Sequence, residues 1–469
     1  MKTADIQQLK RPIPEGFIQA LQDKFGQRCS VAAAVLEQHG SDESPYPTMA
    51  PDVVVYAQTT DEVAWVARHC HEHHVPLIPY GAGTSLEGHV LAVQGGVCLD
   101  LSAMDQILAI HDKDFTATVQ AGVRRESLNA ALSETGLFFP IDPGANATLG
   151  GMAATRASGT NAVRYGTMRE NVLNLTVVMA DGRVVRTAQR AKKSSAGYDL
   201  TRLFIGSEGT LGIITELTVR LHPLPEAVSA AVCHFPTVAD AVHTVIEVIQ
   251  MGIAIARVEF MDVQAIRATN AYSKLNLREQ PLLLFEFHGS PSAVQEQAEL
   301  VQEIAQSHGG MDFDWADQPE DRSRLWAARH QAYFAGLQLR PGAVASTTDV
   351  CVPISELANC VVETAEDMAQ APFPSTILGH VGDGNFHVLM LLSPDDPAEW
   401  QASERLNRRI VQRALKAGGT CTGEHGVGLH KREFLAQEFG ESAVHVMQQI
   451  KHCLDPHHIL NPGKIFFSN

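Results

Sequence analysis

The sequence predicts an α+β protein with two domains and a short segment that returns to the first of them. Short apolar strands alternate with helical patterns up to about residue 225, longer helices and strands follow, and Pro223 and Pro225 mark the change. A chain of 469 residues suits two or three domains. We therefore expect an N-terminal helical segment at 1–45, an α/β domain at 46–225, an α+β domain at 226–455 and the returning segment at 456–469.

The first domain is predicted to open with a strand, a helix and a second strand. Residues 53–57 form a short apolar run typical of a buried strand. Thr59 and Glu62 have the spacing of a capping box, and apolar residues follow at helical intervals. Residues 75–80 form the next strand, which runs directly into a glycine-rich segment. We expect further strands at 97–101, 107–110, 116–121, 173–179, 183–187 and 213–221, and a helix at 126–134.

The glycine-rich segment 81–88 has a spacing that excludes two common phosphate-binding motifs. It reads G-x-G-x-x-x-x-G, which differs from the dinucleotide-binding fingerprint, and no G-K-S/T follows as in a P-loop. Consecutive backbone N–H groups after a strand can still hold a pyrophosphate, although a simple tight turn is the alternative. Two more stretches rich in small residues, at 143–166 and 204–212, favour a large flat or extended ligand over one isolated turn.

Two clustered motifs in the second domain suggest a metal site. His380 and His387 bracket the run G-H-V-G-D-G-N-F-H, and Glu424 and His425 lie in a second glycine-rich run. Two imidazoles and a carboxylate are a plausible set of three ligands for a divalent metal, with positions left open for a substrate. The alternative is that these are polar loop histidines beside a strand at 386–392, but one Glu and three His in two motifs favour the metal site.

The rest of the second domain is predicted as helices at 239–250, 293–307, 322–338, 355–370 and 402–417, with strands at 282–288 and 349–352. Arg329 lies between Trp326 and Tyr333 in the helix at 322–338, where a semi-apolar setting favours a functional arginine over a surface one. Such a guanidinium can hold a carboxylate by a two-point contact.

Composition excludes several classes of protein. With 36 basic and 53 acidic residues the net charge is −17, which argues against binding to nucleic acid or directly to an anionic membrane. The eight cysteines include no C-x-x-C pair, which excludes an iron–sulfur cluster of the usual spacing and indicates reduced thiols. No apolar run is long enough to span a membrane, and residues 1–12 lack a signal or transit pattern. We expect a cytoplasmic protein, at most peripheral to the inner face of a membrane.

Segments 79–88, 147–166, 206–212 and 461–464 resemble the two-subdomain FAD-binding fold of the vanillyl-alcohol-oxidase type, with a substrate domain following it. The resemblance covers nearly all of residues 45–467. It implies FAD bound between two α/β subdomains, and the lack of a clear tethering histidine implies that this FAD is non-covalent. The residues implied as cofactor-binding are Pro79, Gly81, Ala82, Gly83, Thr84, Ser85, Gly88, Pro143, Thr148, Gly150, Gly151, Ser158, Gly159, Asn161, Tyr165, Gly166, Glu208, Gly212, Ile213 and Asn461.

Segments 379–387 and 423–428 are similar to the D-lactate and D-2-hydroxyglutarate dehydrogenase branch of that family, and 325–330, 339–342 and 348–353 look most like its D-lactate type. The resemblance implies that His380, His387 and Glu424 bind Zn, Mn or Fe, that Arg329 anchors the substrate carboxylate and that His425 is the base. The hydroxyglutarate enzymes carry an Asn two residues after the second histidine. Here Leu389 takes that position, which favours a short or apolar acid.

The expected reaction is oxidation of a D-2-hydroxy acid to a 2-oxo acid, with a hydride passed to the flavin and on to an external acceptor such as a quinone, a cytochrome or a carrier flavoprotein. Alternatives are a D-2-hydroxyglutarate or glycolate dehydrogenase, a flavin subunit of a larger oxidase, and a metallohydrolase that uses His380, His387 and Glu424 without redox chemistry. The hydrolase leaves the glycine-rich first domain unexplained. We also expect a homodimer.

Overall fold

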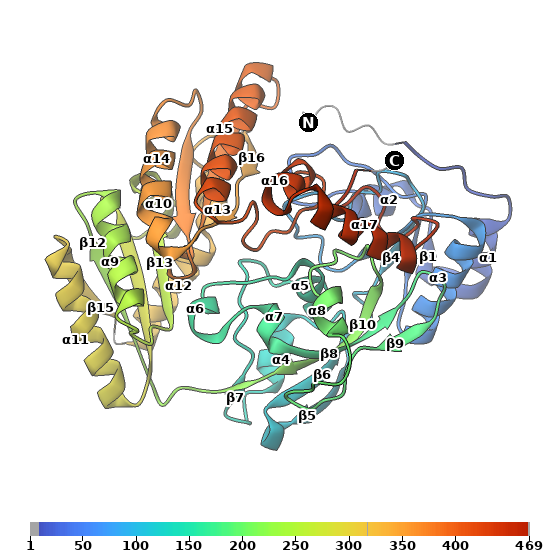
Figure 1. Cartoon of the computed structure of the whole chain (residues 1–469), viewed down its shortest axis with the longest axis horizontal. Coiled ribbons are helices and arrows are strands. Elements are labelled where there is room, and N and C mark those ends of the chain that lie inside the picture. The colour runs from blue at the N-terminus through green and yellow to red at the C-terminus, as the bar shows by residue number, and fades with distance from the viewer. Residues whose placement is uncertain (1–8, 317, 468–469) are drawn as a thin grey trace. The chain divides into compact units, whose positions relative to one another are not determined.

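The computed structural model (Figure 1) describes residues 9–316 and 318–467 and consists of two compact units. Unit 1 holds the described residues up to Ser158, then Gly166–Leu224 and those from Glu424 onward. Unit 2 holds Gly159–Tyr165 and Pro225–Gly423. The long segment of unit 2 thus begins at Pro225, next to the boundary predicted at 225/226, whereas the short segment Gly159–Tyr165 falls inside the range predicted for the first domain. The chain returns to unit 1 at Glu424, well before residue 456, where the sequence analysis places the return.

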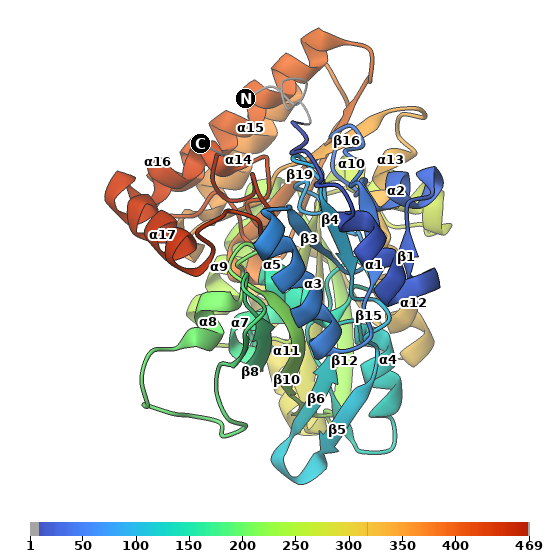
Figure 2. The same ribbon diagram turned by 90° about the vertical axis from the view of Figure 1, so that its right-hand side faces the viewer.

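Unit 1 begins with a four-stranded sheet in the order β1 (Cys29–Ser30), β2 (Val53–Tyr56), β4 (Val97–Asp100) and β3 (Leu77–Tyr80). β2, β4 and β3 run parallel, and α3 (Thr60–His73) is the crossover from β2 to β3. Figure 2 shows α3 beside α1 (Phe17–Phe25). Apolar residues of α3, such as Val63, Val66 and Cys70, share a core with α1 and these strands. This is the strand–helix–strand order that the sequence predicts.

The other sheet of unit 1 is antiparallel, in the order β5 (Ile107–His111), β6 (Thr116–Gln120), β10 (Ile213–Arg220), β8 (Val172–Val178) and β9 (Val184–Arg186). β8 and β9 form the predicted hairpin around Gly182, whose φ of 81° suits glycine. A two-stranded pair joins β7 (Leu137–Phe138) and β11 (His222–Pro223). The helices of unit 1 are, besides α1 and α3, α2 (Ala33–His39), α4 (Arg125–Ala131), α5 (Leu149–Thr155), α7 (Met168–Asn171), α8 (Leu200–Phe204), α16 (Leu435–Phe439) and α17 (Glu441–Leu454), with short 3-10 turns η2 (Gly26–Arg28), η3 (Asp112–Asp114) and η6 (Arg432–Phe434).

Unit 2 is built on one large antiparallel sheet in the order β15 (Met311–Ala316), β12 (Ala227–His234), β14 (Leu282–Gly289), β13 (Arg257–Met261), β18 (Ser375–Gly379), β19 (Asn385–Leu392) and β16 (Val344–Thr347), with β17 (Val350–Cys351) also paired to β19. Its helices are α6 (Ala162–Tyr165), α9 (Val238–Gln250), α10 (Val263–Ser273), α11 (Pro291–Ser307), α12 (Pro319–His330), α13 (Ala332–Leu337), α14 (Leu357–Ala369) and α15 (Pro397–Lys416), with 3-10 turns η4 (Ile354–Glu356) and η5 (Val381–Asp383). The core that α10 and α12 form with this sheet lies on the sheet face that carries Leu284 and Leu378.

The helix predicted at 322–338 is two helices, because the chain breaks at Gln331. Trp326 of α12 and Ala332 of α13 pack in one cluster with α10. The later part of α13 packs on β19, where a Cβ on Gly336 would lie 2.4 Å from Leu389 Cδ2. The capping box is also incomplete: Thr59 accepts the Glu62 N–H, but the Glu62 carboxylate accepts from Gln58 N and pairs with Arg28.

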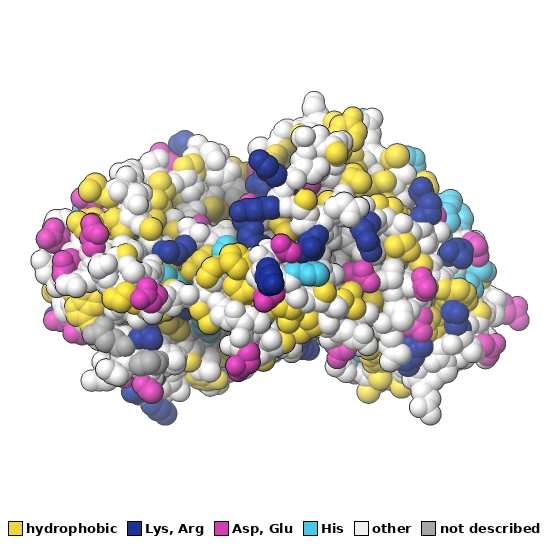
Figure 3. Space-filling model, turned by 90° about the horizontal axis from the view of Figure 1, so that it is seen from below, with side chains coloured by type: hydrophobic (Ala, Val, Ile, Leu, Met, Phe, Trp, Pro, Cys, Tyr) yellow, Lys and Arg dark blue, Asp and Glu magenta, His cyan; other side chains and the backbone are white. Residues whose placement is uncertain are grey.

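The surface carries no continuous acidic region on the face drawn in Figure 3, where acidic and basic side chains alternate with neutral and hydrophobic ones. All eight cysteines are free thiols. Among the residues that the structure describes, no helix combines the length and the apolar character needed to cross a membrane.

Candidate functional site

The three glycine-rich stretches of the sequence meet in unit 1. A Cβ on Gly81 would lie 2.4 Å from the Thr148 hydroxyl, and a Cβ on Gly209 would lie 2.4 Å from Pro79 Cγ. Gly83 has a φ of +68°, and its Cβ would lie 2.2 Å from the Tyr80 hydroxyl. All three positions need glycine for close approach, Gly83 and Gly209 need it also for their positive φ, and the loop after β3 is left with bare backbone. Such a backbone suits a pyrophosphate and a flat ring system.

Not all of the predicted cofactor residues fall in unit 1. Gly159, Asn161 and Tyr165 belong to unit 2. There Asn161 Oδ1 accepts a hydrogen bond from Arg257 Nε at 2.9 Å, and the Tyr165 hydroxyl lies 2.8 Å from His288 Nδ1. The part of these three residues in binding FAD stays a prediction. The side chains of Asn161 and Tyr165 also form hydrogen bonds within unit 2.

Glu208, predicted to bind the cofactor, uses its carboxylate to hold the C-terminal loop of unit 1. It accepts the N–H groups of Val427 and Gly428 at 2.6 and 2.9 Å and lies 3.1 Å from His89 Nε2. Its own backbone has a φ of 53°, an unusual conformation for a glutamate. Asn461 makes further hydrogen bonds to the same residues, because its Nδ2 donates to the carbonyls of His89 and Glu208.

Glu87 is a buried carboxylate at the end of the first glycine-rich loop, and three basic side chains converge on it. Lys431 Nζ lies 2.9 Å away, His430 Nδ1 lies 3.0 Å away and His425 Nδ1 lies 3.5 Å away. Burial alone would raise the pKa of Glu87, but Lys431 and the two histidines outweigh it, so that the pKa is lowered. The carboxylate therefore stays ionised beneath His425, the predicted base. Glu87 lies inside the first glycine-rich segment, 81–88, but is not among the predicted site residues.

The two histidines of the first metal-type motif lie together in unit 2. His380 follows β18, His387 lies in β19, and their ring centroids are 5.5 Å apart. The turn between them is tight, because Gly384 has a φ of +79° and its Cβ would lie 2.1 Å from the Val352 carbonyl oxygen. The hairpin therefore brings the two rings together as the sequence predicts.

Each of these histidines has a fully buried carboxylate at its Nδ1. His380 Nδ1 lies 2.7 Å from Glu259 Oε1, and His387 Nδ1 lies 3.4 Å from Asp349 Oδ1. Asp349 is fixed in turn by Asn385 Nδ2 and the Thr422 hydroxyl, both at 2.8 Å. A carboxylate at Nδ1 sets the tautomer and leaves Nε2 as the electron-pair donor, which is the usual arrangement of metal-binding histidines. This donor set fits a divalent metal.

Arg329 shares the carboxylate of Glu259 with His380. Its Nη2 lies 2.6 Å from Glu259 Oε2, and the side chain is buried. Its Nε is also buried and has no hydrogen-bond partner among the described residues. A buried donor without a partner is costly, so this atom suits a bound anion such as a substrate carboxylate.

His380, His387 and Arg329 thus lie in unit 2, whereas Glu424 and His425 belong to unit 1. Thr422 and Gly423, which immediately precede Glu424 in the chain, contact Asp349 and Asn385 in unit 2. Sequence reasoning misses Glu259 and the role of Asp349. The available signal for Glu259 is an acidic residue between two apolar ones, Val258 and Phe260.

The chain matches two family profiles and several known proteins. The profile of the C-terminal domain of FAD-linked oxidases matches residues 224–465, and that of an FAD-binding domain matches residues 51–188. A probable mitochondrial D-lactate dehydrogenase of Danio rerio is 52% identical over 439 residues, 93% of this chain and 88% of the relative. A mitochondrial D-lactate dehydrogenase (cytochrome) of Arabidopsis thaliana is 47% identical over 91% of this chain and 76% of the relative, and glycolate oxidase subunit GlcD of Bacillus subtilis is 35% identical over 91% of each.

Solved structures with low sequence identity share the fold. p-Cresol methylhydroxylase is 18% identical with a TM-score of 0.79 and covers 98% of this chain and 99% of its own. Alkyldihydroxyacetonephosphate synthase is 19% identical with a TM-score of 0.76 and covers 98% of this chain and 88% of its own. The predicted α+β, two-part flavoprotein fold of the vanillyl-alcohol-oxidase type is therefore confirmed, and the chain belongs to the family of FAD-linked oxidases.

Proposed function

We propose that the protein oxidises D-lactate, or a similar short or apolar D-2-hydroxy acid, to the corresponding 2-oxo acid. The observation that carries the proposal is the arrangement around Glu259, which pairs with His380 and also with Arg329, an arginine with a buried donor left for an anion. The relatives that are named D-lactate dehydrogenases and span most of this chain support it. FAD is the cofactor, and it supplies the hydride acceptor when bound.

In this proposal the protein's own groups bind, orient and deprotonate the acid. Arg329 holds the substrate carboxylate and fixes which face of C2 is presented. His425 accepts the proton of the C2 hydroxyl, since an imidazole can act as a base near neutral pH. The C2–H bond breaks with its electron pair, a carbonyl forms at C2, and the product is a 2-oxo acid. Glu87, close to His425 Nδ1, keeps the ring oriented.

The proposal includes a divalent metal, with Zn, Mn and Fe as candidates, held by His380, His387 and Glu424. The buried carboxylates at the Nδ1 atoms of both histidines support it, because they orient the rings for Nε2 coordination. Such a metal would polarise the hydroxyl group and favour its loss of a proton. A glutamate as third ligand agrees with the nitrogen and oxygen donors that these metals accept.

Several further features belong to the proposal. FAD is bound by residues of the glycine-rich stretches, without a covalent tether. Unit 1 is the cofactor domain, and unit 2 is the substrate domain. Electrons pass to an external acceptor, for which a cytochrome is favoured by the name of the Arabidopsis relative. A homodimer and a cytoplasmic location are also retained as predictions, although several relatives are named mitochondrial.

The decisive experiment is anaerobic reduction of the bound flavin by a panel of D- and L-lactate, glycolate and D-2-hydroxyglutarate. We expect D-lactate to bleach the flavin absorbance fastest and L-lactate to be inert. Faster bleaching by glycolate or D-2-hydroxyglutarate would replace the proposed substrate by one of these. A colourless, folded protein would instead favour the metallohydrolase. Full flavin content without turnover of any acid would favour a subunit that needs a partner.

A further inference from the structure

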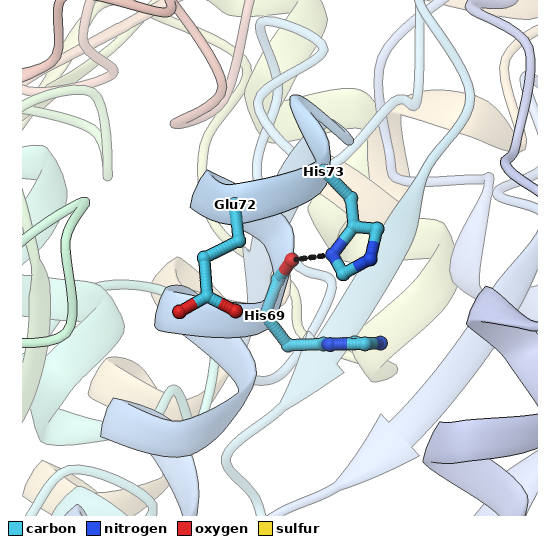
Figure 4. Close-up of side chains that lie close together, drawn as sticks. All are labelled: His69, Glu72 and His73. Atoms are coloured by element: carbon cyan, nitrogen blue, oxygen red, sulfur yellow. Dashed lines mark hydrogen bonds between the residues drawn. The ribbon is translucent and has the colours of Figure 1, made fainter.

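A second group of histidines and a carboxylate lies on α3 in unit 1, outside the proposed catalytic residues. The side chains of His69, Glu72 and His73 project from the last turns of this helix (Figure 4). One possible ligand atom from each lies within 4.8 Å of the others. The spacing i, i+3 and i+4 places all three on neighbouring positions of the helix surface. Figure 4 shows the two imidazole rings together on one side of the helix, with the hydrogen bond from His73 Nδ1 to the His69 carbonyl.

His69 is held in place by aromatic rings. It stacks on Phe17 at 4.4 Å and on Trp65 at 5.0 Å between ring centroids. Its Nε2 lies 3.4 Å from the Phe17 carbonyl, which leaves Nδ1 as the atom available for coordination. The ring is thus an immobile ligand that loses little freedom on binding.

His73 and Glu72 are exposed and can move to complete the site. His73 Nδ1 lies 2.9 Å from the His69 carbonyl oxygen and acts as a donor to it, so its Nε2 is the electron-pair donor and faces no partner among the described residues. The Glu72 carboxylate makes no hydrogen bond or ion pair within the described part of the chain. Zinc needs donors at about 2.0–2.2 Å, which small rotations of two exposed side chains can provide.

The topology of unit 1 separates this group from the cofactor loop. The three residues lie at the C-terminal end of α3, which the chain leaves to enter β3 at Leu77. The glycine-rich loop follows the other end of β3, after Tyr80. Because β3 lies between the two in the chain, the group and the loop lie at opposite ends of this strand.

We propose that His69, His73 and Glu72 form a second binding site for a divalent transition metal of the zinc type, separate from catalysis. Two imidazoles and one carboxylate leave a coordination position for water, and a mainly nitrogen donor set prefers Zn, Cu or Ni over Mg or Ca. Bound metal would crosslink the last turns of α3 and stabilise the folded state by mass action.

The test uses untagged, FAD-loaded protein that carries His380→Ala and His387→Ala, so that the proposed catalytic site contributes no metal. After chelator treatment the protein is dialysed against micromolar Zn²⁺, and zinc per chain is measured by elemental analysis. We expect about one equivalent of zinc, as for a single site with three protein ligands. Addition of His73→Asn should abolish this binding, and Glu72→Gln should weaken it.

His74→Asn is the matched control. His74 is the next residue, is exposed and has a φ of 56°, a left-handed conformation that asparagine tolerates. Zinc binding should also raise the melting temperature of the protein. The His74→Asn variant should keep both the bound zinc and this rise, whereas the His73→Asn variant should lose both. Equal zinc binding by the two variants would overturn the proposal, as would absence of zinc from the starting protein. In the otherwise unchanged chain, loss of turnover by His73→Asn would disprove the separation from catalysis.

Discussion

His380 Nδ1 lies 2.7 Å from Glu259 Oε1, although 121 residues separate the two in the chain. Antiparallel pairing of β13 with β18 brings them together, because Phe260 lies opposite Gly379. The other oxygen of Glu259 lies 2.6 Å from Arg329. One buried carboxylate therefore orients both a proposed metal ligand and the proposed substrate anchor.

The first prediction concerns this carboxylate. Glu259→Gln keeps the size of the side chain but removes the charge that holds His380 and Arg329. We expect kcat/KM for D-lactate to fall by about 10–100-fold, as is usual when the partner of a metal-binding histidine is lost. Steady-state kinetics and metal content would both be measured.

Glu399→Gln is the control for Glu259→Gln, since Glu399 is also buried in unit 2 and pairs with Arg340 at 2.8 Å. It should lower stability while kcat/KM stays near that of the unchanged protein. If both variants lost activity to the same extent, the effect would reflect folding, and the orienting role of Glu259 would be wrong.

The second prediction separates the base from the anchor. His425→Ala should lower kcat by roughly 10²–10⁴-fold, because a general base acts mainly in the transition state. Arg329→Ala should chiefly raise KM, because it removes binding that is present in both ground and transition states. Arg329→Lys should restore only part of the loss, since lysine lacks the planar fork.

Kinetics of the two alanine variants test these roles together. A raised KM with intact kcat for His425→Ala, combined with the opposite result for Arg329→Ala, would show that the roles are exchanged. Unchanged parameters in both variants would place the substrate elsewhere.

The sequence predicts those parts of the site that depend on local pattern. The turn between His380 and His387 needs glycines, and glycines with paired histidines are visible in one short run. The helices and strands at 53–80 also follow from apolar periodicity. These features are encoded within about ten residues of one another, where pattern and spacing are most informative.

The parts that sequence reasoning misses depend on sheet order. β13 carries charged residues at 257 and 259 and therefore looks unlike a buried strand, although Glu259 is fully buried. Its burial is tolerated because Arg329 and His380 approach from other elements. Likewise, the return of residues 424–455 to unit 1 depends on long-range ties, such as that between Glu208 and Gly428, which are 220 residues apart.

The third prediction is that chelation abolishes turnover and leaves FAD bound. The proposed metal ligands and the glycine-rich cofactor stretches are different segments, so loss of metal should not release the flavin. EDTA treatment, His380→Ala and His387→Ala should each remove D-lactate oxidation while the flavin spectrum is kept. Asp383→Asn should have less effect, because we interpret Asp383 as a turn residue in η5. Undiminished activity after both treatment and substitution would exclude the catalytic metal.

The fourth prediction concerns substrate choice at Leu389. This side chain is 2% exposed and packs with Ala345 and Leu391 in an apolar cluster beneath α13. It lies two residues after His387 in β19, on the same face of the strand. A distal carboxylate would find no polar partner there, so kcat/KM should be higher for D-lactate than for D-2-hydroxyglutarate.

Leu389→Asn tests the same position, and the ratio of the two kcat/KM values is the proper measure. An amide in this apolar cluster is expected to cost about 1–3 kcal/mol of stability, which lowers the active fraction for both substrates equally. The ratio is independent of that fraction, and it should shift toward the diacid. A preference of the unchanged protein for D-2-hydroxyglutarate would refute the argument from Leu389.

The last prediction is a pH dependence of stability that comes from Lys464. Its ammonium group is 2% exposed and donates to the Leu91 carbonyl at 2.6 Å and to Asn461 Oδ1 at 3.0 Å. Burial lowers its pKa in the folded protein from 10.5 to about 7. Between these two values the unfolded chain binds more protons at this residue than the folded chain, so stability rises with pH across this window. Below about pH 7 both states are protonated, and the cost of burying the charge is fully present.

Lys464→Met removes this titration while it keeps an unbranched side chain in the same space. The stability of the variant relative to the unchanged protein should therefore be highest near pH 6. This difference in stability should shrink steadily toward pH 10. The measurement is the difference in apparent melting temperature between the two FAD-loaded proteins across that range, which cancels the titration of all other groups. Lys113→Met, at an exposed position in η3, should give a difference that is flat with pH. A flat difference for Lys464→Met as well would show that the buried ammonium does not titrate in this window. A difference that grew in favour of the variant as the pH rose would reverse the sign of the argument.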